Sequence, residues 1–123
     1  MTSRDRSLLR TPAHSAHERL GARFSEFAGW LLPLRYPAGT LEEHLRTRNT
    51  AGVFDVSHLG RLLVEGPGAF TLLQMAFTND LSRISPGKAQ YTLLLNESGG
   101  IVDDIVVLWE TPDRFVVVPN AAN

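Results

Sequence analysis

The order of apolar and polar residues predicts an antiparallel sheet in the second half of the chain. Short runs rich in valine, isoleucine and leucine are separated there by turn sequences, and they predict strands over 61–65, 89–95, 101–109 and 114–118. The sequence Asn96-Glu-Ser-Gly-Gly100 predicts a hairpin loop between two of them. Because short connections join neighbouring antiparallel strands, we expect the last three strands to form a meander.

Two helices are expected in the first half of the chain. Thr11-Pro12 provides a capping hydroxyl followed by a proline suited to a first helical turn, and Gly21 is a plausible end for this helix. Thr40 and Glu43 have the spacing of a capping box, in which each side chain bonds the backbone of the other. This spacing predicts a second helix over about 41–50.

A third helix is expected from Ala69 to Phe77, where apolar side chains recur at helical spacing and Asn79 provides a left-handed stop. The segment from Phe24 to Pro37 follows neither the helical nor the strand period, and indicates an ordered aromatic loop or a short strand. Helices that precede one antiparallel sheet indicate an α+β fold, with the helices packed on one face of the sheet.

Composition narrows the classes of function. The 123 residues suffice for one domain, and 12 Lys and Arg against 13 Asp and Glu leave a net charge of −1. This balance lacks the basic excess that attracts nucleic acid or an anionic membrane surface, and no apolar run approaches the ~20 residues of a membrane span. Because the chain has no cysteine, disulfides, thiol nucleophiles and thiolate metal sites are excluded.

The first ten residues are polar and carry Arg4, Arg6 and Arg10. They lack the apolar core of a secretion signal, so we expect a flexible N-terminus over 1–10 and a cytoplasmic protein.

Asp103 and Asp104 are the first candidates for chemistry. They lie in the predicted strand 101–109, where successive side chains point to opposite faces, so one of them must face the less exposed side. Burying an unpaired carboxylate there lowers the free energy of unfolding by several kcal/mol. Proteins usually retain such a group for a reason. From the residues alone, a pair that caps the Gly99-Gly100 turn is the simpler interpretation, and a functional carboxylate is the alternative.

The histidines give weaker signals. His14 and His17 lie one helical turn apart, but the pattern offers no third ligand, and no metal site is predicted. Asp55, Ser57 and His58 combine an acid, a hydroxyl and an imidazole. However, the nucleophile-elbow pattern is absent and triad members normally come from distant segments, so a polar turn is favoured.

Five blocks of residues, in this order and spacing, resemble the aminomethyltransferase (T protein) family of the glycine cleavage system. They are Phe27-Ala-Gly-Trp30, Phe54-Asp-Val-Ser-His58, Thr78-Asn-Asp80, Leu93-Leu-Leu-Asn-Glu97 and Gly99-Gly-Ile-Val-Asp-Asp104. The resemblance runs from about Leu8 to Asn123. It implies a tetrahydrofolate-dependent transferase that takes an aminomethyl group from the lipoyl arm of a carrier (H) protein, releases ammonia and forms methylene-tetrahydrofolate.

The resemblance also implies that residues 11–123 are the N-terminal portion of a folate-binding domain. Members of the family are roughly three times as long as this chain. We therefore expect the chain to be truncated at its C-terminal end and inactive by itself.

The resemblance assigns roles to five residues. The family's catalytic aspartate is the second in the Gly-Gly-Ile-x-Asp-Asp motif and corresponds to Asp104, which replaces the turn-capping interpretation of this residue. Folate-binding positions correspond to Tyr91, which lines the pteridine pocket, to Val106 and Leu59 in its walls, and to Asn120, a polar neighbour of the folate.

Three positions depart from the family. Leu59 stands where methionine is frequent, Leu108 where tyrosine is frequent, and Pro119 precedes Asn120 where an unrestricted residue is usual. Two related classes share the blocks: a folate-binding assembly factor for iron–sulfur proteins, and a folate-dependent demethylase or a folate domain fused to an amine oxidase. The sequence leaves both open, although the intact blocks favour the transferase.

Overall fold

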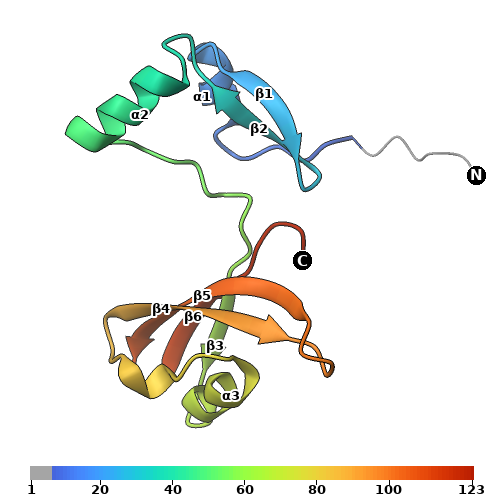
Figure 1. Ribbon diagram of the computed structural model, residues 1–123, viewed down its shortest axis with the longest axis vertical. Coiled ribbons are helices and arrows are strands. Elements are labelled where there is room, and N and C mark those ends of the chain that lie inside the picture. Colours follow the sequence, from blue (N-terminus) through green and yellow to red (C-terminus); the bar gives the residue numbers. More distant parts are fainter. Residues whose placement is uncertain (1–6) are drawn as a thin grey trace, which may run out of the picture. The chain divides into compact units, whose positions relative to one another are not determined.

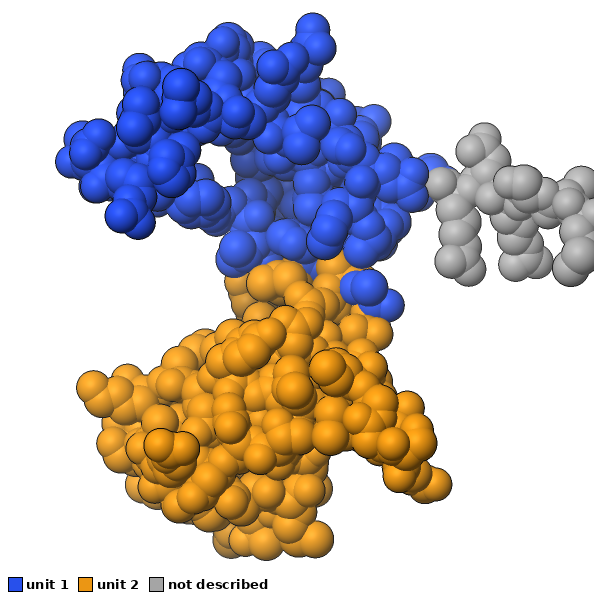
Figure 2. Space-filling model, viewed as in Figure 1, with its two compact units in different colours: residues 1–58, 122 blue, residues 59–121, 123 orange. Residues whose placement is uncertain are grey.

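The computed structural model describes residues 7–123, which form two compact units (Figure 2). Unit 1 contains the described residues up to His58 together with Ala122, and unit 2 contains Leu59–Ala121 together with Asn123. Each unit combines α-helix with antiparallel strands, which confirms the predicted α+β class (Figure 1). Within the described residues, no helix is long and apolar enough to cross a membrane.

Unit 1 contains a β-hairpin where the sequence indicated a loop or a short strand. Strands β1 (Arg23–Phe27) and β2 (Trp30–Arg35) pair in antiparallel register around a two-residue turn. Ala28 and Gly29 both have positive φ, 49° and 79°, as a hairpin turn of the primed type requires. The short-strand alternative is therefore the correct one, but the hairpin itself was not predicted. Alanine is unusual at this turn position, so the turn has no recognisable pair such as Asn-Gly.

The first helix, α1 (His14–Arg19), begins later than Thr11-Pro12 predicts. Its N-cap is Ala13, which makes no side-chain cap bond, so the predicted cap is wrong. The Thr11 hydroxyl bonds Asp55 instead, and a tertiary partner has replaced the local one. Gly21 follows α1 with φ of 73°, the left-handed conformation expected of a helix stop.

The second helix, α2 (Thr40–Asn49), lies close to its predicted range but lacks the predicted capping box. Its N-cap is Gly39, and no side chain caps it. The Glu43 carboxylate accepts a hydrogen bond from the backbone N–H of Tyr36 at 2.8 Å, so it is not available to Thr40 in the manner of a capping box. The helix forms at the predicted place, although Glu43, whose spacing from Thr40 predicted it, bonds the backbone of Tyr36.

Leu9, in the N-terminal segment, makes backbone hydrogen bonds to the β1–β2 hairpin. Leu9 donates a backbone hydrogen bond to the carbonyl of Gly29 and accepts one from Leu31, at 2.9 and 2.8 Å. Residues 1–6 lie outside the described part of the chain, and the flexibility of the segment 1–10 stays a prediction.

Unit 2 is a four-stranded antiparallel sheet with one α-helix. Its strands follow the order β3-β6-β5-β4, which confirms the predicted meander of the last three. The strands are β3 (Leu62–Glu65), β4 (Lys88–Leu95), β5 (Ile101–Thr111) and β6 (Arg114–Val118), and the helices are α3 (Ala69–Ala76) and the single 3-10 turn η1 (Leu81–Arg83). Helix α3 ends at an extended Phe77, and Asn79 does not adopt the predicted left-handed conformation.

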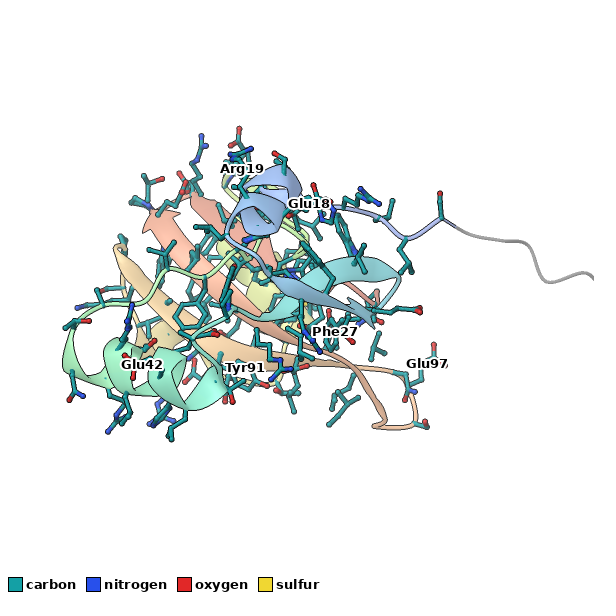
Figure 3. The ribbon with its side chains drawn as sticks, turned by 90° about the horizontal axis from the view of Figure 1, so that it is seen from above. Glu18, Arg19, Phe27, Glu42, Tyr91 and Glu97 are labelled. Carbon is teal, nitrogen blue, oxygen red and sulfur yellow. The ribbon has the colours of Figure 1, made fainter. Side chains whose placement is uncertain are left out.

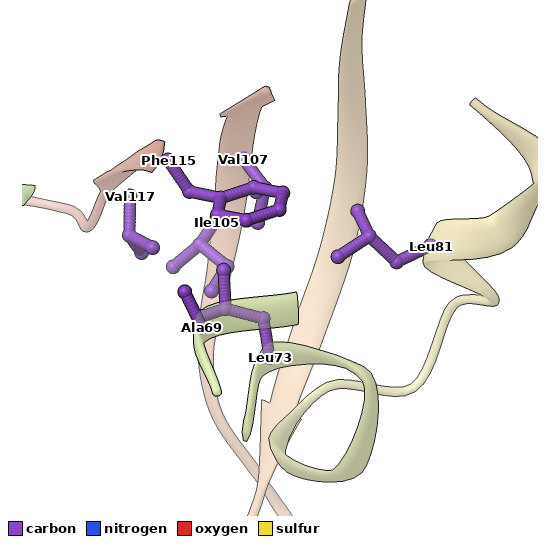
Figure 4. Close-up of a cluster of buried hydrophobic side chains, with 7 residues drawn as sticks. All are labelled: Ala69, Leu73, Leu81, Ile105, Val107, Phe115 and Val117. Carbon is purple, nitrogen blue, oxygen red and sulfur yellow. The ribbon is translucent and has the colours of Figure 1, made fainter. Parts of the chain in front are cut away.

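The apolar core of the described residues lies entirely in unit 2. It joins one face of the sheet to α3 and η1 (Figure 4) and consists of Ala69, Leu73, Leu81, Ile105, Val107, Phe115 and Val117. The residues of unit 1 that are buried are polar, namely Thr11, His14 and His17. Apolar burial therefore accounts for the stability of unit 2 but not for that of unit 1.

Replacing Leu73 with alanine tests this core. Leu73 is 3% exposed and Leu72, its neighbour on α3, is 59% exposed. We expect Leu73→Ala to lower the free energy of unfolding by about 2–5 kcal/mol because it leaves a cavity, and Leu72→Ala to lower it by less than about 1 kcal/mol. Urea unfolding followed by circular dichroism measures both, and equal losses would contradict the assigned core.

Candidate functional site

The two aspartates of β5 face opposite sides of the sheet, as the strand alternation predicts. Asp103 is 5% exposed and lies on the same face as Ile105 of the core, whereas Asp104 is exposed and shares its face with Val106. Asp103 is therefore the carboxylate in the interior. Asp104, to which the resemblance assigns the catalytic role, lies on the exposed face.

Both carboxylate oxygens of Asp103 accept hydrogen bonds from the segment that follows β6. The backbone N–H of Asn120 donates to Oδ2 of Asp103 at 3.1 Å, and its side-chain Nδ2 donates to Oδ1 at 2.8 Å. Burial by itself raises the pKa of the Asp103 carboxyl, but the hydrogen bonds from Asn120, with smaller contributions from the Asn123 side chain and the Asp104 backbone, together hold the pKa below its usual range. The role of Asp103 is therefore structural, because its hydrogen bonds hold the C-terminal segment against β5.

Asp104 forms a cluster with Tyr91 and Asn120. The Tyr91 hydroxyl donates to Oδ2 of Asp104, and Nδ2 of Asn120 donates to Oδ1 at 2.8 Å. The hydrogen bond to the carboxylate raises the pKa of Tyr91, which keeps this hydroxyl a donor at neutral pH. Three of the five residues singled out by the sequence, from β4, β5 and the segment after β6, therefore meet at one point.

The Asn120 amide is shared between both aspartates. Nδ2 lies 2.8 Å from Oδ1 of Asp103, from Oδ1 of Asp104 and from the backbone carbonyl of Asp104. An amide nitrogen carries two hydrogens, so at least one of them is shared between acceptors. Asn120 thus ties the orientation of the exposed carboxylate to that of the buried one.

The other two predicted residues lie near this cluster along the backbone. Val106 is half-buried and is the register partner of Tyr91 between β4 and β5. Tyr91, labelled in Figure 3, is 56% exposed, so its ring and Val106 form an accessible apolar surface next to the carboxylate. Leu59 is half-buried and precedes Gly60, whose N–H donates to the carbonyl of Pro119, the residue before Asn120, at 3.1 Å.

Unit 1 contains a second polar cluster, which no sequence pattern predicts. His17 Nε2 lies 2.9 Å from Oδ2 of Asp55, and the Tyr36 hydroxyl lies 2.7 Å from His17 Nδ1. Burial alone raises the pKa of Asp55, yet hydrogen bonds from Thr11, Ser57 and His17 hold it well below its usual range. The partners are 38 and 19 residues apart, a separation that no local pattern reveals.

The Asp55, Ser57 and His58 group forms the polar turn that the sequence favoured. The backbone N–H of Ser57 donates to Oδ1 of Asp55 at 3.0 Å, while the imidazole bound by Asp55 is His17. Nδ1 of His58 is buried and has no hydrogen-bond partner among the described residues. This geometry does not assemble a catalytic triad.

Removing the Asn120 side chain tests its control over Asp103. A carboxyl whose pKa is lower in the folded than in the unfolded chain stabilises the fold above the unfolded pKa, and this stability is lost as pH falls through the folded pKa. In Asn120→Ala fewer hydrogen bonds oppose the effect of burial, so the Asp103 pKa rises towards its unfolded value. The stability that Asp103 contributes at neutral pH, and the part of it that is lost in acid, both become smaller. Carbon-13 NMR of the Asp103 carboxyl measures the shift, with Asn49→Ala, exposed on α2, as control. An unchanged pKa in Asn120→Ala would contradict the assignment.

Replacing Asp55 with asparagine tests the cluster in unit 1. The Asp55 side chain is 8% exposed, and the change weakens its bonds to Thr11, Ser57 and His17. We expect Asp55→Asn to destabilise unit 1 by about 1–3 kcal/mol, seen as faster amide hydrogen exchange over 14–19 and 30–36. Glu26→Gln, an exposed change on β1, is the matched control and should leave the exchange unaltered. Equal exchange in both variants would show that the cluster is not stabilising.

Comparison with known proteins gives these residues a context. The chain is 54% identical over 121 residues to an aminomethyltransferase of Mycobacterium avium (strain 104), a match that covers 98% of this chain and 33% of that protein. It is 54% identical over 116 residues to the Mycobacterium tuberculosis (strain ATCC 25618 / H37Rv) aminomethyltransferase, covering 94% of this chain and 31% of the relative. The chain thus spans about a third of the length of the curated relatives it matches.

The crystal structure of glycine cleavage system aminomethyltransferase T from Bartonella henselae has a similar fold. The TM-score is 0.89 at 45% sequence identity, over 95% of this chain and 32% of that one. The family model described as the GCVT N-terminal domain matches residues 13–123. The resemblance to aminomethyltransferases is therefore confirmed, and the chain belongs to the GCVT N-terminal domain family.

Proposed function

We propose that this chain provides one wall of the tetrahydrofolate site of a glycine cleavage aminomethyltransferase, with Asp104 as its catalytic residue. The observation that carries the proposal is the cluster of Asp104, Tyr91 and Asn120 on the exposed face of the sheet. The relatives of this chain are named aminomethyltransferase, so we propose the transferase and neither the assembly factor nor the demethylase.

The residues present suit a folate ring. Each oxygen of the Asp104 carboxylate accepts one hydrogen bond within the chain, from Asn120 or from Tyr91. An ionised carboxylate has about four acceptor positions, so this exposed group retains capacity for N–H donors of a ligand. Tyr91 and Val106 offer an adjoining apolar surface, which suits a flat heteroaromatic ring.

In the proposed reaction one methylene carbon exchanges two of its bonds for two others. The methylene carbon loses its bonds to the lipoyl sulfur of a carrier protein and to the amino nitrogen, and gains bonds to two folate nitrogens. The two hydrogens displaced from those nitrogens end on the sulfur and on the departing ammonia. A carboxylate that accepts a hydrogen bond from the attacking amine orients its lone pair and moves its proton, which is general-base work suited to Asp104.

Tyr91 and Asn120 act in this proposal by holding the carboxylate still. Because each bonds a different oxygen of Asp104, rotation of the carboxylate breaks at least one hydrogen bond. Fixing a catalytic group before the substrate arrives lowers the cost of reaching the reactive geometry.

A complete enzyme is needed to test catalysis, and a chimera supplies one. In it, residues 8–123 of this chain replace the matching segment of the Mycobacterium tuberculosis aminomethyltransferase, to which it is 54% identical. We expect Asp104→Asn to lower kcat by about 100-fold or more, because general-base catalysis contributes about 10²–10⁴-fold. The Kd for tetrahydrofolate should stay within about tenfold, since the shape of the side chain is kept.

The control for this experiment is Asp113→Asn, which removes the charge of an exposed aspartate in the turn between β5 and β6. It should leave both kcat and the folate Kd unchanged. If Asp104→Asn retains the kcat of the parent chimera, Asp104 is not the catalytic residue.

A further inference from the structure

Two arginines lie side by side at the open end of the hairpin in unit 1. Arg23 begins β1 and Arg35 ends β2, and the antiparallel register makes them direct partners. The turn at Ala28 and Gly29 lies at the other end of the hairpin (Figure 1). Like charges directly opposite each other on two strands destabilise a sheet. In natural proteins, positions that break such a local rule are expected at functional sites.

A β-bulge brings the two arginines into register. Phe24 pairs with Pro33, so an uninterrupted ladder would place the next residue of β2, Leu34, opposite Arg23. The register shifts at this point, and Arg35 takes the place of Leu34. Bulges redirect side chains and are frequent next to functional sites. The juxtaposition of the two charges is therefore a product of this irregularity and not of the regular hairpin.

No carboxylate of the described residues forms an ion pair with either arginine. The acidic side chains described in unit 1 have other partners, with one exception: His14 for Glu18, Arg46 for Glu42, the Tyr36 backbone for Glu43 and His17 for Asp55. The exception is Glu26, the register partner of Leu31, which is four residues and about 13 Å from Arg35 along β2. The described part of unit 1 thus leaves the charge of both arginines available to a ligand.

The two arginines line a pocket whose walls are held in place. The pocket has a volume of about 330 Å³ and is lined by Gly21, Arg23, Arg35, Tyr36 and Pro37. The Tyr36 hydroxyl lies 2.7 Å from Nδ1 of His17, which fixes this wall. Gly21 has a φ of 73°, and a Cβ there would lie 3.1 Å from Cγ of Pro37, so these two walls pack closely. A site that is formed before its ligand arrives loses less entropy on binding.

The chemistry of the pocket favours a phosphate group. Each guanidinium has five N–H donors in a planar fork and no acceptor, and this fork matches the spacing of two phosphate oxygens. Two adjacent cations complement the charge of about −1.5 to −2 that a phosphate monoester carries at neutral pH, whereas a single carboxylate neutralises only one of them. A volume of about 330 Å³ lies at the lower end of the range for small-molecule sites, so it has room for more than the phosphate itself.

We propose that Arg23 and Arg35 form a binding site for a phosphate group, either free phosphate or the phosphate of a small phosphorylated molecule. Each guanidinium donates hydrogen bonds to the phosphate oxygens, and the bound anion offsets the repulsion between the two cations. The site uses none of the residues of the Asp104 cluster, and the inference does not depend on the proposed transferase activity.

Titration of the nitrogen-15-labelled 123-residue chain with inorganic phosphate, followed by NMR at pH 7.5 and constant ionic strength, tests the proposal. The side-chain Nε–Hε signals of Arg23 and Arg35 should shift together and saturate. Arg23→Gln and Arg35→Gln should each weaken binding by about tenfold or more, because hydrogen bonds to a charged group are lost. Arg35→Lys should also weaken it, since lysine keeps the charge but lacks the planar fork. The backbone amide spectrum of each sample shows that the variant keeps its fold.

The matched control is Arg48→Gln. Arg48 is also an exposed arginine of unit 1, but it lies on α2 and does not line the pocket. This variant should bind phosphate with the affinity of the parent chain. A loss equal to that in Arg35→Gln would overturn the proposal, because it would show general attraction of anions to a basic surface.

Two further ligands identify the source of the phosphate. Glycerol 3-phosphate that binds at least tenfold more tightly than inorganic phosphate supports a phosphorylated small molecule, and a smaller difference or weaker binding supports free phosphate. Absence of saturable binding of both would overturn the proposal. Succinate that binds as tightly as either would also overturn it, because the site would then be one for carboxylates. None of these measurements involves turnover in the chimera, so the two proposals can fail separately.

Discussion

Strand β5 has to satisfy a carboxylate on each of its two faces, and the arrangement of unit 2 follows from how it does so. The alternation of the strand turns Asp103 towards the core and Asp104 towards the open face. A buried carboxylate is tolerated only when it is hydrogen-bonded, and Asn120 provides those bonds from the segment after β6. Because the same amide also bonds Asp104, the interaction that offsets burial also orients the candidate catalytic group.

The two units are stabilised by different kinds of interaction. Unit 2 buries a continuous apolar cluster between its sheet and α3, which is non-directional and tolerates small changes of shape. Unit 1 relies on directional hydrogen bonds around His17, whose imidazole joins Tyr36 to Asp55. Such networks specify one geometry but bury little apolar surface.

Local sequence patterns predicted elements well where those patterns also served the tertiary structure. The strands of unit 2 were placed within one or two residues because their apolar alternation is what the core requires. The caps predicted for the first two helices were wrong because Thr11 bonds Asp55 and Glu43 bonds the backbone of Tyr36. The hairpin at Ala28 was missed because its turn relies on an alanine with positive φ. In each case a distant or unusual interaction prevailed over a local preference.

The sequence by itself determined the strands of the sheet and the family, and it required Asp103 and Asp104 to face opposite sides. Only the tertiary structure decided which of the two is buried, since that depends on the face of the sheet against which α3 packs. It also decided that Tyr91 and Asn120 meet at Asp104, and that His17 pairs with Asp55. Periodicity assigns side chains to faces, whereas contacts between distant segments depend on how the whole chain folds.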